Sequence, residues 1–357
     1  MRIAVLHRDE RAKEKYPLDF EGRIEAEDTA SIIRALAALG HEVLPVCASA
    51  NAIFSLKKAK PDIVFNACDD GLESDSLLEP HVAAIIEAIR LPYTGNNYLA
   101  LGLCMNKALA KQILLQKGIL TPDYQLFETG SEKLSDLSFP LIVKPAHEDG
   151  SIGIKQDSVA ENIDELRAKV KNIINNYKQA ALVEEFIEGR EFSVSMIGNE
   201  KIDAFQIAEI VFEESLEKKM RIYSYESKWL KESPHYKKVI DNCPADIDRK
   251  TGEKITQTAI KAFRALGCQG YGRVEFRLRD EELHVIEVNP NSDLSEDAEL
   301  AKSAALSGIS YKELIQRIVM LGLKRGKSKG GVQSEQVYCR PQSKARNNYS
   351  AKRIAVA

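Results

Sequence analysis

The chain has 357 residues, 44% hydrophobic and 29% charged, which is the composition of a globular protein long enough for two or three packed units. Its six cysteines are scattered without a CxxC pair, which argues against a disulfide framework and a zinc site. The start, MRIAVLHRDE, lacks the apolar core of a signal peptide, and the apolar stretch VAAIIEAI is interrupted by Glu87. We therefore expect a cytoplasmic protein with reduced thiols and no membrane role.

The first part of the chain alternates between strand-like and helix-like patterns. The expected elements are a strand at 2–6, a helix at 28–40, buried strands at 41–46 and 61–67, and a helix at 79–91. This rhythm predicts a parallel α/β sheet. No GxGxxG follows the first strand, so a dinucleotide-binding Rossmann site is not expected.

A second unit opens with a helix over 106–118 and continues into the stretch FPLIVKPAHEDGSIGIKQ. Here a strand delivers Lys144 just before a proline, and a glycine-containing loop at 148–154 turns the chain back. Glycines expose main-chain N–H groups to an anion, and a lysine supplies a point charge for phosphate. By itself, however, this pattern fits an ordinary hairpin with a surface lysine better than a triphosphate site.

The stretch ALVEEFIEGREFSVSMIG contains two strands with an acidic turn between them. An extended backbone at 184–187 can read an adenine edge with main-chain groups, and Glu191 suits ribose hydroxyls. The alternative is an exposed acidic turn.

The most specific single signal is CQGYGRVEFRLRDEELHVIEVNPNSD. Glu275 and Glu287 lie on neighbouring strands of an expected hairpin, and residues two apart along a strand share a face, so Asn289 joins Glu287 and Arg273 joins Glu275. Three hard oxygen donors suit magnesium, which completes its coordination with phosphate and water.

Six motifs, YTGN…MNK, LIVKP…GSIG, VEEFIEGRE, YESKW, GRVEF and EVNPN, occur in an order and spacing that resembles the ATP-grasp superfamily, and most closely the D-alanine:D-alanine ligase family. The resemblance covers residues 1 to about 322. It implies an α/β ATP-grasp fold with a Rossmann-like pre-ATP-grasp domain. The implied division is 1–105 for that domain, 106–183 for the ATP-grasp lid subdomain, 184–323 for the catalytic domain and 324–357 for a basic, disordered tail.

The resemblance also implies roles for individual residues. The nucleotide-binding positions would be Lys107, Lys144, Ser151, Glu184, Glu185, Ile187, Glu191 and Lys228. The metal ligands would be Glu275, usually Asp in such ligases, together with Glu287 and Asn289. Arg273 would stabilise a tetrahedral intermediate, and Lys228 would be the second catalytic residue. The implied cofactors are ATP and two Mg²⁺ ions, with Mn²⁺ as a substitute, and the implied assembly is a homodimer.

The substrate positions depart from the family pattern. In D-alanine ligases a serine in the glycine loop and a tyrosine after the loop lysine help to fix the first amino acid, and Gly150 and Trp229 stand there. The first loop contains Glu10 and Glu14 without the family's signature before them.

On the acceptor side, Asp293 and Ala298 replace a glycine and a carboxylate-binding serine. The carboxylates Asp293, Glu296, Asp297 and Glu299 would attract an amine and repel a free carboxylate, or they are simply a solvated helix start.

The basic tail is the remaining feature. Residues 324–357 carry nine Lys or Arg and one Glu, with little apolar periodicity, and a solvated tail is favoured over binding of nucleic acid or a partner.

We therefore predict an ATP-dependent carboxylate–amine ligase that forms an amide or peptide bond through an acyl phosphate. Its partners would be a small carboxylate and an amine, such as an amino acid or short peptide, but not two D-alanines. The alternatives are a D-alanine:D-alanine ligase of peptidoglycan synthesis and, from another class, an ATP-binding regulatory or scaffold protein.

Overall fold

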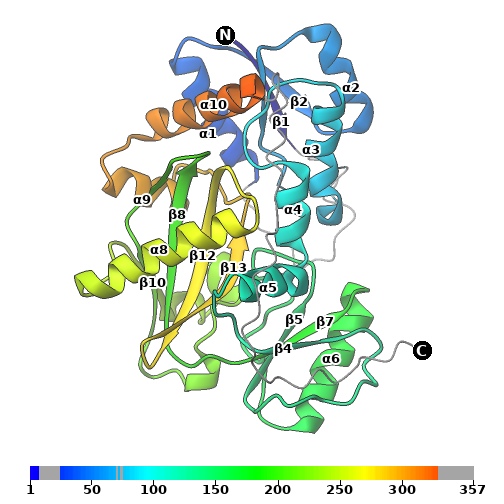
Figure 1. Ribbon diagram of the computed structural model, residues 1–357, viewed down its shortest axis with the longest axis vertical. Helices are drawn as coiled ribbons and strands as arrows, with labels where there is room; N and C mark the ends of the chain where they lie inside the picture. Colours follow the sequence, from blue (N-terminus) through cyan, green and yellow to red (C-terminus); the bar gives the residue numbers. More distant parts are fainter. Residues whose placement is uncertain (8–24, 70, 73–74, 329–357) are drawn as a thin grey trace, which may run out of the picture.

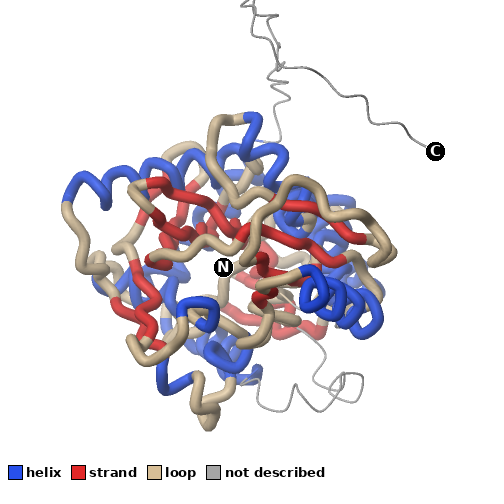
Figure 2. The backbone as a smooth tube through the Cα atoms, turned by 90° about the horizontal axis from the view of Figure 1, so that it is seen from below, coloured by secondary structure: helices blue, strands red, loops and turns tan. Residues whose placement is uncertain are grey.

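The protein is described by a computed structural model over residues 1–7, 25–69, 71–72 and 75–328. Glu10 and Glu14, named above as candidate substrate residues, lie outside these ranges. No helix within them is long and apolar enough to cross a membrane. Figure 1 shows three α/β units along the long axis, with the third unit of the chain between the first at the top and the second at the bottom, and in Figure 2 many of the helices lie around the strands.

The first unit has a parallel sheet in the order β2-β1-β3. Its elements are β1 (Arg2–His7), α1 (Glu25–Ala38), β2 (Glu42–Cys47), α2 (Ala50–Ala59), β3 (Ile63–Asn66), the 3-10 helix η3 (Ser76–Leu78), α3 (Glu79–Ala88) and α4 (Tyr98–Met105). Strand β1 is central, and residues 3–6 are fully buried because helices cover both faces. The predicted alternation of strands and helices is confirmed.

One detail of that prediction is wrong. Strand β2 was expected to be buried, but none of its residues is, because it is an edge strand that pairs only with β1. Pro45 within it fits an edge, since proline cannot donate to a second neighbour.

The second unit is a small antiparallel sheet in the order β4-β7-β5-β6. Its elements are α5 (Lys107–Gln116), β4 (Tyr124–Phe127), β5 (Leu141–Pro145), β6 (Val159–Ala160), α6 (Ile163–Tyr177) and β7 (Ala181–Glu185). Helix α6 packs Leu166, Val170 and Ile173 on one face of the sheet. Strand β7 continues two residues past the expected boundary at 183, and α5 packs Ala110 and Leu114 into the core of the third unit.

The third unit is built on an antiparallel sheet in the order β11-β10-β8-β12-β13, with β9 beside β8. Its elements are β8 (Arg190–Gly198), β9 (Ile202–Ala204), β10 (Ala208–Phe212), η4 (Lys218–Met220), α7 (Tyr225–Trp229), η5 (Tyr236–Lys238), β11 (Val239–Asn242), α8 (Arg249–Ala265), β12 (Gly270–Arg279), β13 (Glu282–Asn289), α9 (Glu299–Leu306) and α10 (Tyr311–Ser328).

The two faces of this sheet differ in chemistry because side chains alternate along each strand. Along β8, Phe192, Val194 and Met196 pack into the core that α8 and α5 share. Glu191 and Ser193 alternate with them and therefore belong to the opposite, polar face.

Helix α10 reaches back to the first unit and covers its sheet, so that Ile3 and Val5 share a core with Leu314 and Ile318. The helix continues to Ser328, and the expected start of the tail at 324 is therefore too early.

A buried arginine lies near the end of this helix. The guanidinium of Arg325 lies 4.1 Å from the centre of the Tyr93 ring and donates to the main-chain carbonyls of Tyr93, at 2.8 Å, and of Gly95. The rest of the predicted tail, residues 329–357, lies outside the described residues.

Candidate active site

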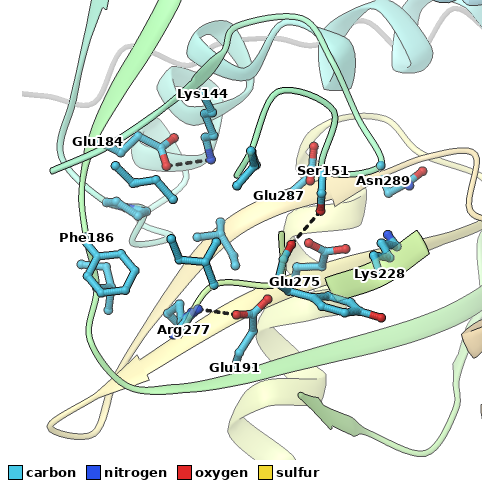
Figure 3. A pocket seen from close by; sticks show the side chains of 18 of the residues that line it. Lys144, Ser151, Glu184, Phe186, Glu191, Lys228, Glu275, Arg277, Glu287 and Asn289 are labelled. Carbon is cyan, nitrogen blue, oxygen red and sulfur yellow. Dashed lines mark hydrogen bonds and ion pairs between the residues drawn. The ribbon is translucent and has the colours of Figure 1, made fainter. Parts of the chain in front are cut away.

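A pocket lies between the small sheet and the polar face of the large sheet. The predicted site residues that line it are Lys144, Ser151, Glu184, Glu185, Ile187, Glu191, Lys228, Arg273, Glu275, Glu287 and Asn289. Lys107 is the one predicted site residue that does not line the pocket, but it forms an ion pair with Glu287, which does. Figure 3 shows two ion pairs of this wall, Lys144 with Glu184 and Arg277 with Glu191.

The candidate metal ligands lie side by side on β12 and β13. Glu275 pairs in register with Glu287, and Arg273 pairs with Asn289, so all four side chains belong to one face as the spacing predicted. The side chains of Glu275 and Glu287 are 20% and 22% exposed, which leaves their carboxylates accessible from the pocket.

Asn96, from the YTGN motif of the first unit, supports this hairpin. Its amide Nδ2 donates to the main-chain carbonyls of Tyr271, at 2.9 Å, and Pro290, at 2.6 Å. These residues lie just before Arg273 and just after Asn289, so the motif ties the first unit to the ends of both site strands.

Lys107 is the first residue of α5, a helix capped by Asn106, whose side chain accepts from Leu109 N at 3.0 Å. The ammonium group of Lys107 forms an ion pair with Glu287. Burial alone would raise the pKa of Glu287, but Lys107 and then Lys144 hold it at about 2. Glu287 is therefore an anion at neutral pH.

Glu184 is 1% exposed, and two lysines share its carboxylate: Lys144 Nζ at 2.7 Å and Lys111 Nζ at 2.9 Å. Burial would raise the pKa of Glu184, but these two ammonium groups lower it. Burial lowers the pKa of Lys111 to about 8, although Glu184 opposes that shift. Lys111 was not predicted, yet its position four residues after Lys107 on the same helix face is a signal that could have identified it.

Two main-chain N–H groups of the segment 184–187, which is predicted to bind adenine, already donate hydrogen bonds within the protein. The main-chain N–H of Glu185 donates to Asp123 O at 2.9 Å, and that of Phe186 donates to Pro140 O at 3.0 Å. A purine would therefore have to use the other main-chain groups of 184–187, including those of Ile187. The Glu184 side chain faces lysines instead.

Glu191, the predicted ribose carboxylate, forms an ion pair with Arg277 at 2.5 Å. Burial raises the pKa of Glu191, and Arg277 offsets this only in part. Arg277 also lies over the rings of Phe186 and Phe212. The sequence analysis missed Arg277, which is two residues beyond Glu275 on the same strand face.

The glycine loop and the segment around α7 close against each other over the pocket. Ser151 Oγ donates to Tyr223 O at 2.8 Å, and the Trp229 indole Nε1 donates to Gly150 O at 2.9 Å. Gly153 has φ +76°, and a Cβ there would lie 2.4 Å from the Pro145 ring, so the loop requires glycine at this position. Gly150 and Trp229, two of the positions that depart from the family pattern, therefore contact each other directly.

Ser224 caps α7 by accepting from Ser227 N at 3.2 Å, and this short helix carries Lys228 into the pocket. The Lys228 ammonium lies 5.7 Å from the centre of the Tyr223 ring and 5.4 Å from that of Trp229. Burial, reinforced by Arg273, lowers the pKa of Lys228, and nearby carboxylates oppose this.

Arg273 is 6% exposed and lies between two carboxylates. Its Nε and Nη2 donate to Glu275 Oε1 at 3.1 and 2.5 Å, and its Nη1 lies 3.7 Å from Glu299 Oε2. Burial alone would lower the pKa of Arg273, but Glu299 and Glu275 raise it, so the guanidinium stays charged.

The acidic segment before α9 divides in two. Glu296 and Asp297 are exposed, and Asp293 Oδ1 accepts from its neighbour Ser295 N at 2.8 Å, as the solvated interpretation predicts. Glu299, in contrast, is turned toward Arg273 and Ser193 of the sheet.

The donor set fits magnesium in its chemistry. Two carboxylates and an amide oxygen from adjacent strands are hard ligands of the kind Mg²⁺ takes. Within the described residues no group of three or more His, Cys, Asp or Glu forms a metal site, so a metal ion here would depend on Asn289 and on non-protein ligands.

Comparison with known proteins agrees with this arrangement. Residues 113–320 match the family model described as D-ala D-ala ligase C-terminus. A D-alanine–D-alanine ligase of Carboxydothermus hydrogenoformans is 33% identical over 82% of this chain and 91% of its own length. An uncharacterized protein, y4sG of Sinorhizobium fredii, is 32% identical over 83% of this chain and 87% of its own.

Solved structures show the same fold. A D-alanine–D-alanine ligase of Bacillus anthracis complexed with ATP aligns with TM-score 0.71 and 24% identity, over 92% of this chain and all of the other. The VanG D-Ala:D-Ser ligase of Enterococcus faecalis aligns with TM-score 0.69 and 18% identity, over 90% of this chain and 99% of the other. The predicted ATP-grasp fold is thus confirmed. The chain belongs to the D-alanine–D-alanine ligase family, whose members use ATP and Mg²⁺, and it is an ATP-dependent ligase that forms C–N bonds.

Proposed function

We propose that this ligase joins a small carboxylic acid to an amine through an acyl phosphate, and that its substrates are not two D-alanines. Nucleotide binding is supported by the ion pairs that basic and acidic side chains of the site form with each other. Lys107 is matched with Glu287, and Arg273 with Glu275. In a magnesium–nucleotide complex, the metal would pair with the two carboxylates and the phosphates would pair with Lys107 and Arg273. Both ion pairs would thus be replaced, and no buried charge would be left without a partner.

In this proposal the lysines Lys107, Lys144 and Lys228 bind the triphosphate, with Ser151 beside them. Main-chain groups of 184–187 bind adenine, and Glu191 binds the ribose.

Glu275, Glu287 and Asn289 would hold two magnesium ions, with Mn²⁺ as a substitute. A metal ion held by these residues would supply positive charge to neutralise the transferred phosphoryl group. The acid's carboxylate oxygen attacks the γ-phosphorus and ADP leaves. The amine then attacks the acyl carbon, Arg273 stabilises the negative charge that develops on the carbonyl oxygen, and phosphate departs with the proton that the amine loses.

The substrate half rests on the contact between Trp229 and Gly150 and on Glu299. The serine and tyrosine hydroxyls that hold the first D-alanine in the resembling family are replaced here by an indole bonded to a main-chain carbonyl. Near the acceptor segment the half-buried Glu299 carboxylate would repel a free carboxylate. Each unmatched polar contact costs about 1–3 kcal/mol, so two or three of them would reduce specificity for D-alanine by several orders of magnitude.

The second candidate is D-alanine dimerisation, which the name of the C. hydrogenoformans relative favours. Coupled ADP release with millimolar D-alanine, alongside pooled amino acids and short peptides with mass detection of products, separates the two. We expect negligible D-alanyl-D-alanine and a product from another acid–amine pair. Efficient formation of the dipeptide would refute our substrate proposal, and ADP release with no coupled product would count against ligation.

A further inference from the structure

Glu299 is the first residue of α9, and its carboxylate is directed at the polar face of the large sheet. Ser193 Oγ donates to Oε1, and Oε2 lies 3.7 Å from Arg273 Nη1. The side chain is 13% exposed. A carboxylate in the first turn of a helix is often explained by the helix dipole. Here the two contacts described for the Glu299 carboxylate are with Ser193 and Arg273 of the large sheet, so these side chains account for its position better than the helix dipole does.

The two carboxylates that hold Arg273 differ in what else they would bind. Glu275 accepts two hydrogen bonds from Arg273, but it is also one of the proposed metal ligands. A metal ion that takes Glu275 would weaken its hold on the guanidinium. Glu299 comes from a different element and belongs to no proposed metal site, so its contact with Arg273 survives.

We propose that Glu299 is a positioning residue that keeps Arg273 directed at the reacting carbonyl once Glu275 is engaged by the metal. The inference rests on the function proposed above for Arg273 and Glu275. Ser193 fixes the orientation of the carboxylate, and Glu299 fixes the guanidinium. Arg273, which would touch the reacting atoms, is the catalytic group, and Glu299 acts through it.

The kinetic test is Glu299→Gln, which removes the charge and keeps the shape. Loss of a whole oxyanion donor costs about 10²–10³ in kcat, so loss of its orientation should lower kcat on the order of tenfold to a hundredfold while the KM for ATP stays unchanged. Glu296→Gln is the matched control, because it is the same change at an exposed carboxylate three residues earlier. An unchanged kcat in Glu299→Gln would overturn the proposal. So would a rise in the KM for ATP as large as the fall in kcat.

A second readout needs no turnover. Phenylglyoxal labelling of Arg273, followed by mass spectrometry, should be severalfold faster in Glu299→Gln than in Glu296→Gln when Mg²⁺ and a non-hydrolysable ATP analogue are present. Without them the rates should be alike, because Glu275 still holds the guanidinium. Equal rates in both conditions would refute the role of Glu299.

A nucleotide-free arm separates failure of this inference from failure of the proposed function. Glu275→Gln imitates the loss of that partner, and adding Glu299→Gln should accelerate Arg273 labelling severalfold over Glu275→Gln alone. This holds even if the unaltered protein releases no ADP, which would count against the ligase mechanism only. If Glu299→Gln does not fold, Ser193→Ala carries the test, with a smaller increase in labelling expected. No increase there would overturn the proposal.

Discussion

Replacing Lys111 with methionine removes one of the two ammonium groups that hold the buried carboxylate of Glu184. The other, Lys144, would then be the only cation within 3 Å of that carboxylate among the described residues, at 2.7 Å. Since Lys144 is also the residue we expect to reach the triphosphate, a stronger hold by Glu184 should withdraw it from the nucleotide. The substitution therefore acts on ATP binding through an intermediate residue.

The magnitude follows from the geometry. At 2.9 Å and an effective dielectric constant of 20, the Lys111–Glu184 attraction is about 6 kcal/mol, and the burial of the lysine cancels several kcal/mol of it. Stripping all partners from a buried charge costs about 3–5 kcal/mol, and Lys144 remains, so we expect unfolding to become easier by about 1–3 kcal/mol. A tighter Glu184–Lys144 pair of about 1–2 kcal/mol should weaken nucleotide binding roughly five- to thirtyfold.

The assay is calorimetric titration with a non-hydrolysable ATP analogue, beside denaturant unfolding. Lys117→Met, at the exposed residue that follows the same helix as its C-cap, is the control and should change neither value. Burial holds the pKa of Lys111 near 8, so raising the pH above 8 should neutralise it and weaken binding in the unaltered protein but not in Lys111→Met. Unchanged affinity in Lys111→Met would refute the reasoning.

Glu287→Gln should abolish magnesium-dependent turnover because it removes a ligand charge and keeps the shape, and it should lower the unfolding midpoint because the buried Lys107 loses its partner; full activity would remove Glu287 from the metal site. Lys144→Ala should weaken ATP binding by about 1.5–3 kcal/mol, and calorimetry giving an unaltered affinity would contradict its assignment. A chain that ends at Ser328 should keep the kinetics and thermal midpoint of the full protein, whereas one that ends at Leu323 loses Arg325 and should unfold more easily by about 1.5–3 kcal/mol. Equal midpoints for the two truncated chains would show that the buried arginine contributes nothing.

The parts of the site that could be predicted depend on short-range order. Strand periodicity was enough to place Glu275 beside Arg273 and Glu287 beside Asn289, because residues two apart share a face whatever the rest of the fold does. The strand–helix alternation of the first unit was equally local.

The parts that were missed depend on partners far away in the chain. Lys111 meets Glu184, and Glu299 meets Ser193, only because the sheets bring helices α5 and α9 over them. The same carboxylate at Glu299 could serve a solvated helix start or the pocket, and only the packing of α9 on β8 decides between them. The start of the tail was placed too early for a similar reason. Among the basic residues there, Arg325 has its partners in the first unit, and composition alone does not distinguish it from the others.

The core shared by β1 and α10 links the two ends of the described chain. The side chains that complete the packing of Ile3 and Val5, Leu314 and Ile318, are synthesised about three hundred residues after them. Such long-range contacts slow folding, and a nascent sheet with an uncovered apolar face is prone to aggregation. The first unit should therefore remain open until α10 has been synthesised, and a chaperone that shields apolar strands should bind it in that interval.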